Sequence, residues 1–252
     1  MKSIQSFACL AALLITTSLT AQERDTGWQT LFDGETLTGW DGDPKFWSVK
    51  DGAITGTTTK DTPTRGNTFI IYVGENKDNK PVEFSDFELK LEYRILNGNS
   101  GIQYRSFKIK GNDRWRIGGY QADFDKGKGW AGTNYGERFR GVLAKRGEKV
   151  SFNSEEVEKD GKKKTVTKRD VEKFGNAKEL AGKIKDAPEW NEYHITAKGY
   201  QLTQKINGVL MSELLDNDKR HRDKGLIAVQ LHQGPPMVVQ VKNVRIKVLE
   251  AK

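Results

Sequence analysis

The amino-acid sequence predicts an all-β fold, a sandwich of two antiparallel sheets. Short segments alternate apolar and polar residues with the period of two that a strand requires. These segments recur about every 8 to 15 residues and are separated by turn residues, as sandwich strands are. Few stretches carry the period of a helix, so helices are expected to form a minor part of the fold.

The first residues, 1–21, are expected to be a signal peptide rather than part of the fold. Lys2 gives a positive start, residues 7–15 form an apolar run, and residues 16–21 are small and polar. The run is too short for a membrane span, and no longer apolar run follows. Residues 22–252 are therefore expected to form one exported domain, periplasmic or secreted. The single cysteine lies in the signal segment, so this domain depends on its core rather than on disulfides.

The predicted strands follow one another along the domain. Phe87 to Tyr93 alternates between apolar and charged residues, and the turn sequence Asn97 to Gly101 leads into the next strand. Tyr193 to Ala197 repeats the alternation. A hairpin follows, because the next strand ends at Asn207-Gly208, the dipeptide preferred in a two-residue type I′ turn. Val244 to Val248 alternates in the same way and is expected to be the last strand.

One charged segment, about residues 153–187, interrupts the strand pattern and is interpreted as an insertion. Residues 159–168 within it are rich in lysine and are expected to be a solvated loop. Residues 169–184 are expected to form a short helix. It would partly bury four apolar side chains, those of Val171, Phe174, Leu180 and Ile184. The formal net charge is +8, but much of the excess falls in this segment, so no nucleic-acid partner is expected.

Polar side chains on three predicted strands differ from those of an ordinary solvated face. They occupy every second position between apolar residues, which places them on the face opposite the core. A solvated face usually carries Lys, Glu and Thr, whereas these strands carry Gln, Arg, Asp and His. The residues are Gln103 and Arg105, then Gln121, Asp123 and Asp125, then Gln230 and His232. Because they come from segments far apart in the sequence, they are expected to form the floor of a site.

An ordered set of motifs covers about residues 27–250. The motifs are GWQTLFDGETLTGW, FWSVKDGAITG, FELKLEYRI, GNSGIQYRS, GYQADFD, YGERFRG, EWNEYHITAKG, KINGVL, GLIAVQLHQGPPM and VQVKNVRIKVLE. In this order they resemble the 3-keto-disaccharide hydrolase domain family. The resemblance implies a jelly-roll sandwich of the concanavalin A type, as in lectins and glucanases, which binds a carbohydrate on its concave sheet.

The resemblance also implies a reaction, the cleavage of the glycosidic bond of a sugar already oxidised to a ketone at C3. The ketone makes the C2 proton acidic, so a base can remove it, the leaving sugar departs from C1 and water adds later. Asp123 or His232 is the expected base, and His232 or Glu137 is the expected acid. Gln121 stands where the family more often carries a glutamate, so this chain would have to use Asp123 instead or lack the activity.

Seven residues are expected to bind the substrate. Amide and guanidinium groups can hold sugar hydroxyls or an enolate oxygen, and exposed aromatic rings can stack on a sugar ring. Trp130 is the preferred stacking platform, and the glycines on either side of Lys128 predict a mobile loop next to it. The full set is Gln103, Arg105, Gln121, Trp130, Tyr135, Arg146 and Gln230.

Two other functions stay open at the level of sequence. The same fold and polar groove would serve a carbohydrate-binding module without catalysis, which the glutamine at position 121 favours. A conventional glycosidase needs two carboxylates, and only Asp123, Asp125 and Glu137 could supply them. The sequence lacks the motifs of a thiol nucleophile, a zinc site, a phosphate-binding loop and a nucleophile elbow. No cofactor is expected, a calcium site at GYQADFD is only weakly indicated, and nothing indicates the oligomeric state.

Overall fold

The computed structural model describes residues 27–75, 81–111, 113–159 and 161–250. The predicted signal peptide lies outside these residues. Within the described part, seventeen strands are accompanied by one helix of five residues, so the predicted all-β fold is confirmed. No helix in the described ranges is long and apolar enough to cross a membrane.

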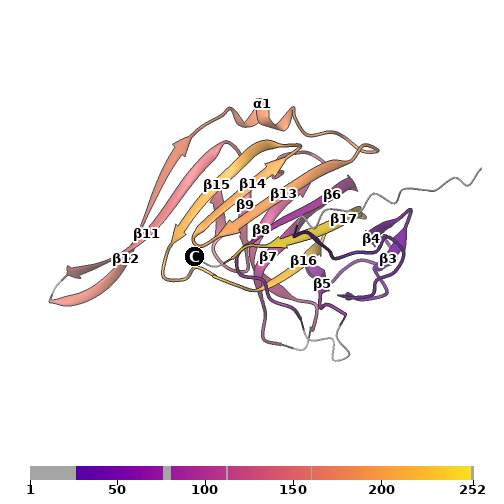
Figure 1. Ribbon diagram of the computed structural model, residues 1–252, viewed down its shortest axis with the longest axis horizontal. Coiled ribbons are helices and arrows are strands. Elements are labelled where there is room, and N and C mark those ends of the chain that lie inside the picture. The colour runs from indigo at the N-terminus through magenta and orange to yellow at the C-terminus, as the bar shows by residue number, and fades with distance from the viewer. Residues whose placement is uncertain (1–26, 76–80, 112, 160, 251–252) are drawn as a thin grey trace, which may run out of the picture.

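The strands form two sheets (Figure 1). The ten-stranded sheet contains, in spatial order, β12 (Lys162–Lys173), β11 (Glu148–Lys159), β15 (Val209–Asn217), β14 (Gln201–Ile206), β13 (Asn191–Lys198), β6 (Phe87–Asn97), β17 (Val238–Val248), β4 (Ala53–Thr57) and β3 (Trp47–Lys50), with β1 (Gln29–Thr30) paired to β17. The seven-stranded sheet contains β10 (Gly141–Ala144), β9 (Asn134–Glu137), β8 (Ile117–Asp125), β7 (Asn99–Lys108), β16 (Leu226–Leu231), β5 (Thr68–Tyr72) and β2 (Trp40–Asp41). Among these described strands, neighbours run antiparallel except β11 and β15, which are parallel.

The hydrophobic core lies between the two sheets. On β6 every second residue from Phe87 to Ile95 is buried, and the residues between them are only half-buried. On β8, Tyr120, Ala122 and Phe124 belong to the same buried cluster. The rings of Tyr93 and Phe124 join the sheets, with centroids 4.2 Å apart. The strand alternation predicted from the sequence is therefore confirmed, because it matches the burial of the side chains.

The predicted hairpin turn is also confirmed. β14 and β15 are antiparallel neighbours, and Asn207-Gly208 connects them. Asn207 has a φ of 51° and Gly208 a φ of 78°, so both central residues have the positive φ that a type I′ turn requires.

The outer face of the seven-stranded sheet, opposite the core, is divided into two halves. The apolar half is buried and consists of Phe69, Ile71, Val73, Ile117, Leu226 and Ala228. The polar half consists of Gln103, Gln121, Asp123 and Gln230. Leu226, Ala228 and Gln230 are alternate residues of β16, so one strand contributes to both halves. The predicted polar floor therefore lies on the face of this sheet that points away from the core.

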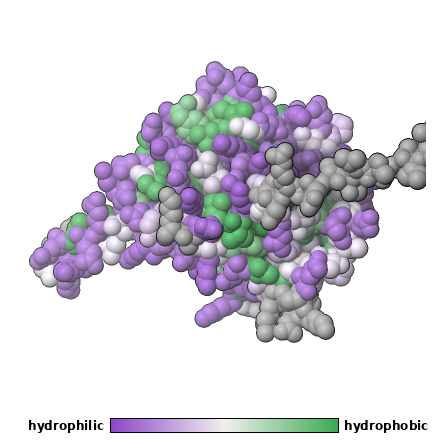
Figure 2. Space-filling model, in the orientation of Figure 1, coloured by the Kyte–Doolittle hydropathy of each residue, from purple (hydrophilic) through white to green (hydrophobic). Residues whose placement is uncertain are grey.

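The charged insertion folds differently from its prediction. β11 and β12 pair as a long hairpin that projects from the sandwich (Figure 1), and its surface is mostly hydrophilic (Figure 2). Residues 162–168 are thus strand rather than loop, and residues 169–173 are strand rather than helix. Helix α1 is confined to Ala177–Ala181. Of the apolar side chains expected to be partly buried, the structure buries Ile184, half-buries Leu180, and exposes Val171 and Phe174. The predicted helix is thus confirmed only over Ala177–Ala181, and for residues 169–173 the prediction is wrong because pairing with β11 overrides a weak local pattern.

Candidate functional site

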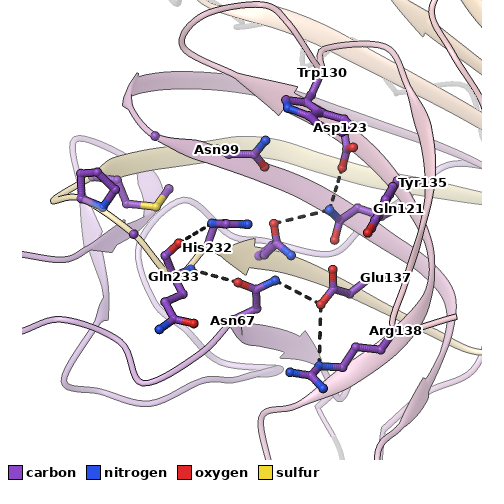
Figure 3. A pocket seen from close by; sticks show the side chains of 15 residues that line it. Asn67, Asn99, Gln121, Asp123, Trp130, Tyr135, Glu137, Arg138, His232 and Gln233 are labelled. Atoms are coloured by element: carbon purple, nitrogen blue, oxygen red, sulfur yellow. Dashed lines mark hydrogen bonds and ion pairs between the residues drawn. The ribbon is translucent and has the colours of Figure 1, made fainter. Parts of the chain in front are cut away.

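A pocket of about 780 Å³ opens on the polar half of the outer face (Figure 3). Its lining side chains come from four strands and several loops. The strands contribute Asn99, Gln121, Asp123, Tyr135, Glu137 and Gln230, and the loops contribute Asn67, Trp130, Arg138, His232, Gln233 and Met237. The structure brings all three predicted catalytic residues, Asp123, Glu137 and His232, to this one pocket. A pocket of this volume is large enough for a sugar ring with its substituents.

The floor of the pocket is a directed chain of hydrogen bonds through buried glutamines. Ser106 Oγ donates to Gln103 Oε1 at 2.5 Å, and Gln103 Nε2 donates to Gln121 Oε1 at 2.5 Å. Gln121 Nε2 then donates to Asp123 Oδ1 at 2.6 Å. Gly101 makes room for this chain, since a Cβ atom there would lie 2.5 Å from Cγ of Gln121. The chain fixes the orientation of each amide and ends on the Asp123 carboxyl group.

Gln230 completes the floor and carries an unused donor. Its Oε1 accepts a long hydrogen bond of 3.4 Å from Gln121 Nε2. Its Nε2 is buried and has no hydrogen-bond partner among the residues that the structure describes. An unpaired buried amide costs free energy, so a ligand oxygen bound here would be stabilised by this group.

Asp123 is buried at the end of this chain, and its side chain is only 3% exposed. Burial raises the pKa of its carboxyl group well above the ordinary value of 3.8, because desolvation penalises the charged form. The negative charges of Glu137 and Asp125 raise this pKa further, while the hydrogen bond from Gln121 lowers it. Asp123 therefore keeps a proton at pH values where an exposed aspartate has lost it, which suits a group that exchanges protons with a substrate.

Glu137 is oriented by neighbours on two sides. Asn67 Nδ2 donates to Glu137 Oε1 at 3.1 Å, and Arg138 Nε lies 4.0 Å from the same oxygen. Asn67 Oδ1 in turn accepts from the backbone N–H of Gln233 at 2.9 Å. One amide side chain thus connects Glu137 to the turn that follows His232 (Figure 3).

His232 follows β16 and is half-buried. Its Nδ1 lies 2.5 Å from the backbone oxygen of Gln233. A carbonyl oxygen can only accept a hydrogen bond, so this contact requires the proton on Nδ1. The neutral ring is thereby left with an unprotonated Nε2, and His232 can take a proton through that atom.

Trp130 is 45% exposed and lies at the rim of the pocket. The loop that carries it, predicted to be mobile, is capped by one carboxylate. Asp125 Oδ1 accepts from the backbone N–H groups of Trp130 and Ala131 at 2.8 and 3.0 Å, and its Oδ2 accepts from Gly129 at 3.0 Å. The Trp130 ring meets Tyr135 edge-on, with centroids 6.2 Å apart. A large apolar ring is thus held in place where a sugar ring could stack on it.

Tyr135 contributes a hydroxyl group to the wall of the pocket. It pairs with Gln121 across β8 and β9. Burial raises the pKa of this hydroxyl, and the carboxylates of Glu137 and Asp123 raise it further. The phenol therefore stays protonated at neutral pH and remains a hydrogen-bond donor.

Arg105 lies away from the pocket, so its predicted place on the floor is wrong. Its backbone adopts a φ of 44°, and the register of β7 against β8 shifts between Tyr104 and Phe107. The alternation of the strand therefore ends after Tyr104. The guanidinium group donates to Asp86 at 2.8 Å and to the backbone oxygens of Ser85, Gly199 and Arg222. A β-bulge, which the residue pattern does not reveal, makes this side chain a structural anchor.

Two further predicted binding residues lie beside the pocket rather than in its lining. Gln103 is fully buried and reaches Asp123 only through Gln121. Arg146 supports the Trp130 loop by donating to three backbone oxygens, those of Lys128, Ala131 and Ala177. Both residues therefore act on the pocket through other groups.

Sequence reasoning misses Asn67, Asn99 and Met237, which also line the pocket. Asn99 had a usable signal, because it shares the strand face of Gln103 at an interval of four residues on β7. Asn67 precedes β5 in a segment without alternation, and Met237 follows a turn. Their places depend on loop conformations, which carry no periodic signal.

The described ranges, 27–75, 81–111, 113–159 and 161–250, also bear on the predicted absence of a metal site. No group of three or more His, Cys, Asp or Glu side chains there could hold a metal ion. Asp125, within the weakly indicated calcium motif, uses both carboxylate oxygens to cap the Trp130 loop. The side chains lining the pocket thus supply carboxyls, amides, one imidazole, one guanidinium, aromatic rings and the thioether of Met237.

A polar pocket with an exposed tryptophan, on one sheet of a β-sandwich, is suited to holding a sugar ring. The chain belongs to the 3-keto-alpha-glucoside-1,2-lyase-like domain family, whose model matches residues 27–247. The resemblance predicted from the motifs is thereby confirmed over nearly the whole domain.

Solved structures share this fold at low sequence identity. A putative glycosyl hydrolase from Parabacteroides distasonis aligns with a TM-score of 0.52 and 19% identity, over 92% of this chain and 99% of the other. A second putative glycosyl hydrolase from the same organism aligns with a TM-score of 0.51 and 17% identity, over 88% of this chain and 99% of the other. At such identity the likeness establishes the fold alone. A search of curated proteins found no match.

Proposed function

We propose that this domain cleaves the glycosidic bond of 3-keto-glycosides by elimination, followed by the addition of water. One observation carries the proposal: a single pocket holds a buried acid with a raised pKa, Asp123, and an imidazole with an unprotonated Nε2, His232. Membership of the 3-keto-alpha-glucoside-1,2-lyase-like family supports the substrate class and the bond that breaks. We also propose that the domain acts after export, to the periplasm or outside the cell, on the basis of residues 1–21.

The elimination uses the acidity of the C2 proton beside the C3 ketone. A base removes this proton, and the electron pair forms an enolate on the C3 oxygen. The enolate then collapses to the ketone, a double bond forms between C1 and C2, and the bond from C1 to the leaving oxygen breaks. An acid gives its proton to that oxygen. Water then adds across the double bond, with hydroxide at C1 and a proton at C2, to release the 3-keto sugar.

Named side chains fit each role in this scheme. His232 is the base, because its contact with the following carbonyl leaves Nε2 free to accept the C2 proton. Asp123 is the acid, because burial raises the pKa of its carboxyl group and so favours the protonated form. Glu137 is the second candidate for the acid. The hydroxyl of Tyr135 and the unused Nε2 of Gln230 are donors that would hold the enolate or a sugar hydroxyl.

The register of β8 and β9 sets the backbones of Asp123 and Glu137 farther apart than the carboxyl groups of a conventional glycosidase. Gly119 pairs with Glu137, so Asp123 and Glu137 lie four residues apart along neighbouring strands. Four residues of strand span about 13 Å. Retaining and inverting glycosidases place their carboxyl groups only about 5 and about 6.5 to 9.5 Å apart. Direct displacement on an unoxidised sugar would therefore need both side chains to lean far toward each other.

Carbohydrate binding without turnover is the second candidate, and one observation favours it. Gln121 occupies the floor at the position where the family more often carries a glutamate. Its amide is used as acceptor and donor in the floor, so it is neither acid nor base. Under this alternative the pocket would hold a sugar that is released unchanged.

Turnover of oxidised and unoxidised sugars separates these candidates. The wild type is incubated with 3-keto-trehalose and 3-keto-lactose, and with trehalose and lactose, and the released monosaccharides are measured by chromatography. The proposal predicts release from the 3-keto sugars alone. Asp123→Asn and His232→Gln are expected to lose it, whereas Asp170→Asn, on the projecting hairpin, makes the matched control and keeps it. Release from the unoxidised sugars would favour a conventional glycosidase, and binding without any release would favour a binding module.

A further inference from the structure

A second pocket of about 770 Å³ adjoins the first, and the two share Trp130 as a lining residue. The second pocket lies among the loop that carries Trp130, the turn between β10 and β11, and the segment that leads from β12 into α1. The predicted catalytic residues lie outside this space, whereas Trp130 and Arg146, both predicted to bind the substrate, line it. Its volume is sufficient for another sugar ring or an aromatic group of similar size.

The charged side chains around this second pocket are mostly cationic. Lys145, Arg146 and Lys173 line it together with one carboxylate, Glu148. Glu148 is already engaged, because its Oε2 accepts from the backbone N–H of Lys145 at 3.1 Å and lies 3.5 Å from the guanidinium of Arg169. Neither lysine, nor Arg146, forms an ion pair with any carboxylate in the described ranges. The pocket lining therefore carries an excess of positive charge, which the carboxylate of Asp125, acting on Arg146 without an ion pair, offsets only in part.

Arg146 gives this positive charge a fixed position. Its Nε donates to the backbone oxygen of Ala177 at 2.8 Å, and its Nη1 donates to those of Lys128, at 2.8 Å, and Ala131. Its Nη2 makes no hydrogen bond to any residue that the structure describes. Carbonyl groups orient the guanidinium without cancelling its charge, and an arginine stays protonated even when half-buried. The two N–H groups of Nη2 on this fixed cation are thus left for another partner.

We propose that this second pocket binds the leaving group of the substrate, and that it selects leaving groups with an anionic substituent such as a carboxylate or a sulfate. The inference rests on the proposed function, which puts the 3-keto ring beside Asp123. A substrate that extends from the first pocket past Trp130 into the second would place its leaving group near Lys145, Lys173 and Nη2 of Arg146. Charge-assisted hydrogen bonds from these groups would stabilise an anion there.

Binding of charged and neutral probes tests the proposal without any need for turnover. The probes are the 4-carboxyphenyl and 4-carbamoylphenyl glucosides, which differ mainly in charge, and the 4-sulfophenyl glucoside, which distinguishes a sulfonate from a carboxylate. Isothermal titration of the wild type is expected to show at least about fivefold tighter binding of an anionic probe than of the neutral one, as two to three partly exposed charge pairs would give.

The double variant Lys145→Gln/Lys173→Gln is expected to lose most of this preference. Lys163→Gln/Lys168→Gln makes the matched control, because it removes the same charge from the projecting hairpin outside the pocket, and it is expected to keep the preference within about twofold. Equal binding of all probes by the wild type, or an unchanged preference in Lys145→Gln/Lys173→Gln, would overturn the proposal. Arg146 is left intact because it holds the Trp130 loop.

Turnover of the corresponding 3-keto-glucosides separates failure of the subsite from failure of the reaction. If these are cleaved with equal kcat/KM whatever their charge, the anionic subsite is refuted and the reaction stands. If none is cleaved while the glucosides still show the charge-dependent binding, the subsite stands and the reaction is refuted. The ratio of kcat/KM for the carboxyl and carbamoyl substrates is the quantity to compare between the wild type and the variants.

Discussion

The two halves of the outer face of the seven-stranded sheet use the same strands for opposite purposes. On β16, Leu226 and Ala228 belong to the buried apolar half, whereas Gln230, two residues further, belongs to the floor of the pocket. On β8, Ile117 belongs to the apolar half, whereas Asp123 belongs to the floor of the pocket. The backbone places all these side chains on one face, so only their chemistry differs.

This difference shows how a site can be built on a stable sheet. The apolar half stabilises the sheet by removing its side chains from water. The polar half is equally buried. Burying polar groups is unfavourable, and the hydrogen bonds that run from Gln103 through Gln121 to Asp123 offset this free-energy penalty. Two groups stay only partly satisfied: Nε2 of Gln230, which has no partner among the described residues, and the carboxyl group of Asp123, whose pKa is raised. The apolar half therefore contributes stability, and the polar half contributes the proton chemistry.

The largest effect is expected from a substitution in the polar half. Asp123→Asn keeps the shape and the hydrogen bond from Gln121 but removes the titrating proton, so kcat/KM for a 3-keto-glycoside is expected to fall by about 10² to 10⁴-fold. Steady-state kinetics measure the loss, and circular dichroism checks that the fold is retained. A variant with wild-type kcat/KM would show that Asp123 is not part of the proton chemistry.

The next largest effect is expected from a substitution in the apolar half. Ile71 is buried in this half, and Ile71→Ala removes packing and leaves a cavity. The free energy of unfolding is expected to fall by about 2 to 5 kcal/mol, measured by urea denaturation. The kcat of the folded fraction is expected to stay within about twofold of the wild type, since a stability role moves the folded population rather than the chemistry. A selective loss of kcat in fully folded protein would mean that the two halves are not separate.

A smaller effect is expected at the rim. Trp130→Ala removes an exposed ring whose loop is held by Asp125, so the fold should be little affected. Substrate affinity is expected to weaken by about tenfold, since aromatic contacts contribute about 0.5 to 1.5 kcal/mol beyond their buried area. Trp130→Phe, which keeps an aromatic ring, is expected to recover part of the affinity. Titration calorimetry with the unoxidised sugar measures both variants, and unchanged binding by Trp130→Ala would exclude stacking at this position.

The smallest effect is a pH dependence of stability. The pKa of Asp123 is raised in the folded state, so its protonated form is favoured by folding, and the stability that it contributes below pH 3.8 is lost as the pH rises through the raised pKa. Asparagine does not titrate. Asp123→Asn is therefore expected to be more stable than the wild type at pH 8, and the difference should shrink toward pH 4. Thermal midpoints across this range measure it, and a variant that is less stable at pH 8 would contradict the assigned direction of the pKa shift.

The fold class could be predicted from the sequence because side-chain alternation is a local property. The period of two on β6, β8 and β16 indicated which residues face the core, and the Asn207-Gly208 dipeptide indicated its turn. The hairpin of β11 and β12 was missed because its charged residues carry no apolar alternation. Its strands are specified by pairing with each other and with β15, which local pattern does not encode.

The candidate site was predictable only where its side chains follow regular strands. Gln121, Asp123 and Gln230 lie on the floor because the alternation continues through them. Arg105 was misplaced because a β-bulge after Tyr104 interrupts the alternation. Asn67 could not be found, since its link between Glu137 and the turn after β16 depends on tertiary contacts across the sheet.

The central claim, that cleavage proceeds by elimination, is tested most directly by the isotope content at C2 of the product. Cleavage of a 3-keto-glycoside in D₂O by elimination and hydration should place one deuterium at C2 of the released 3-keto sugar, detected by NMR or mass spectrometry. An enzyme-free sample of that sugar at the same pH measures spontaneous exchange, and Asp170→Asn should incorporate deuterium like the wild type. Released sugar that keeps its hydrogen at C2 would contradict elimination and indicate direct displacement at C1.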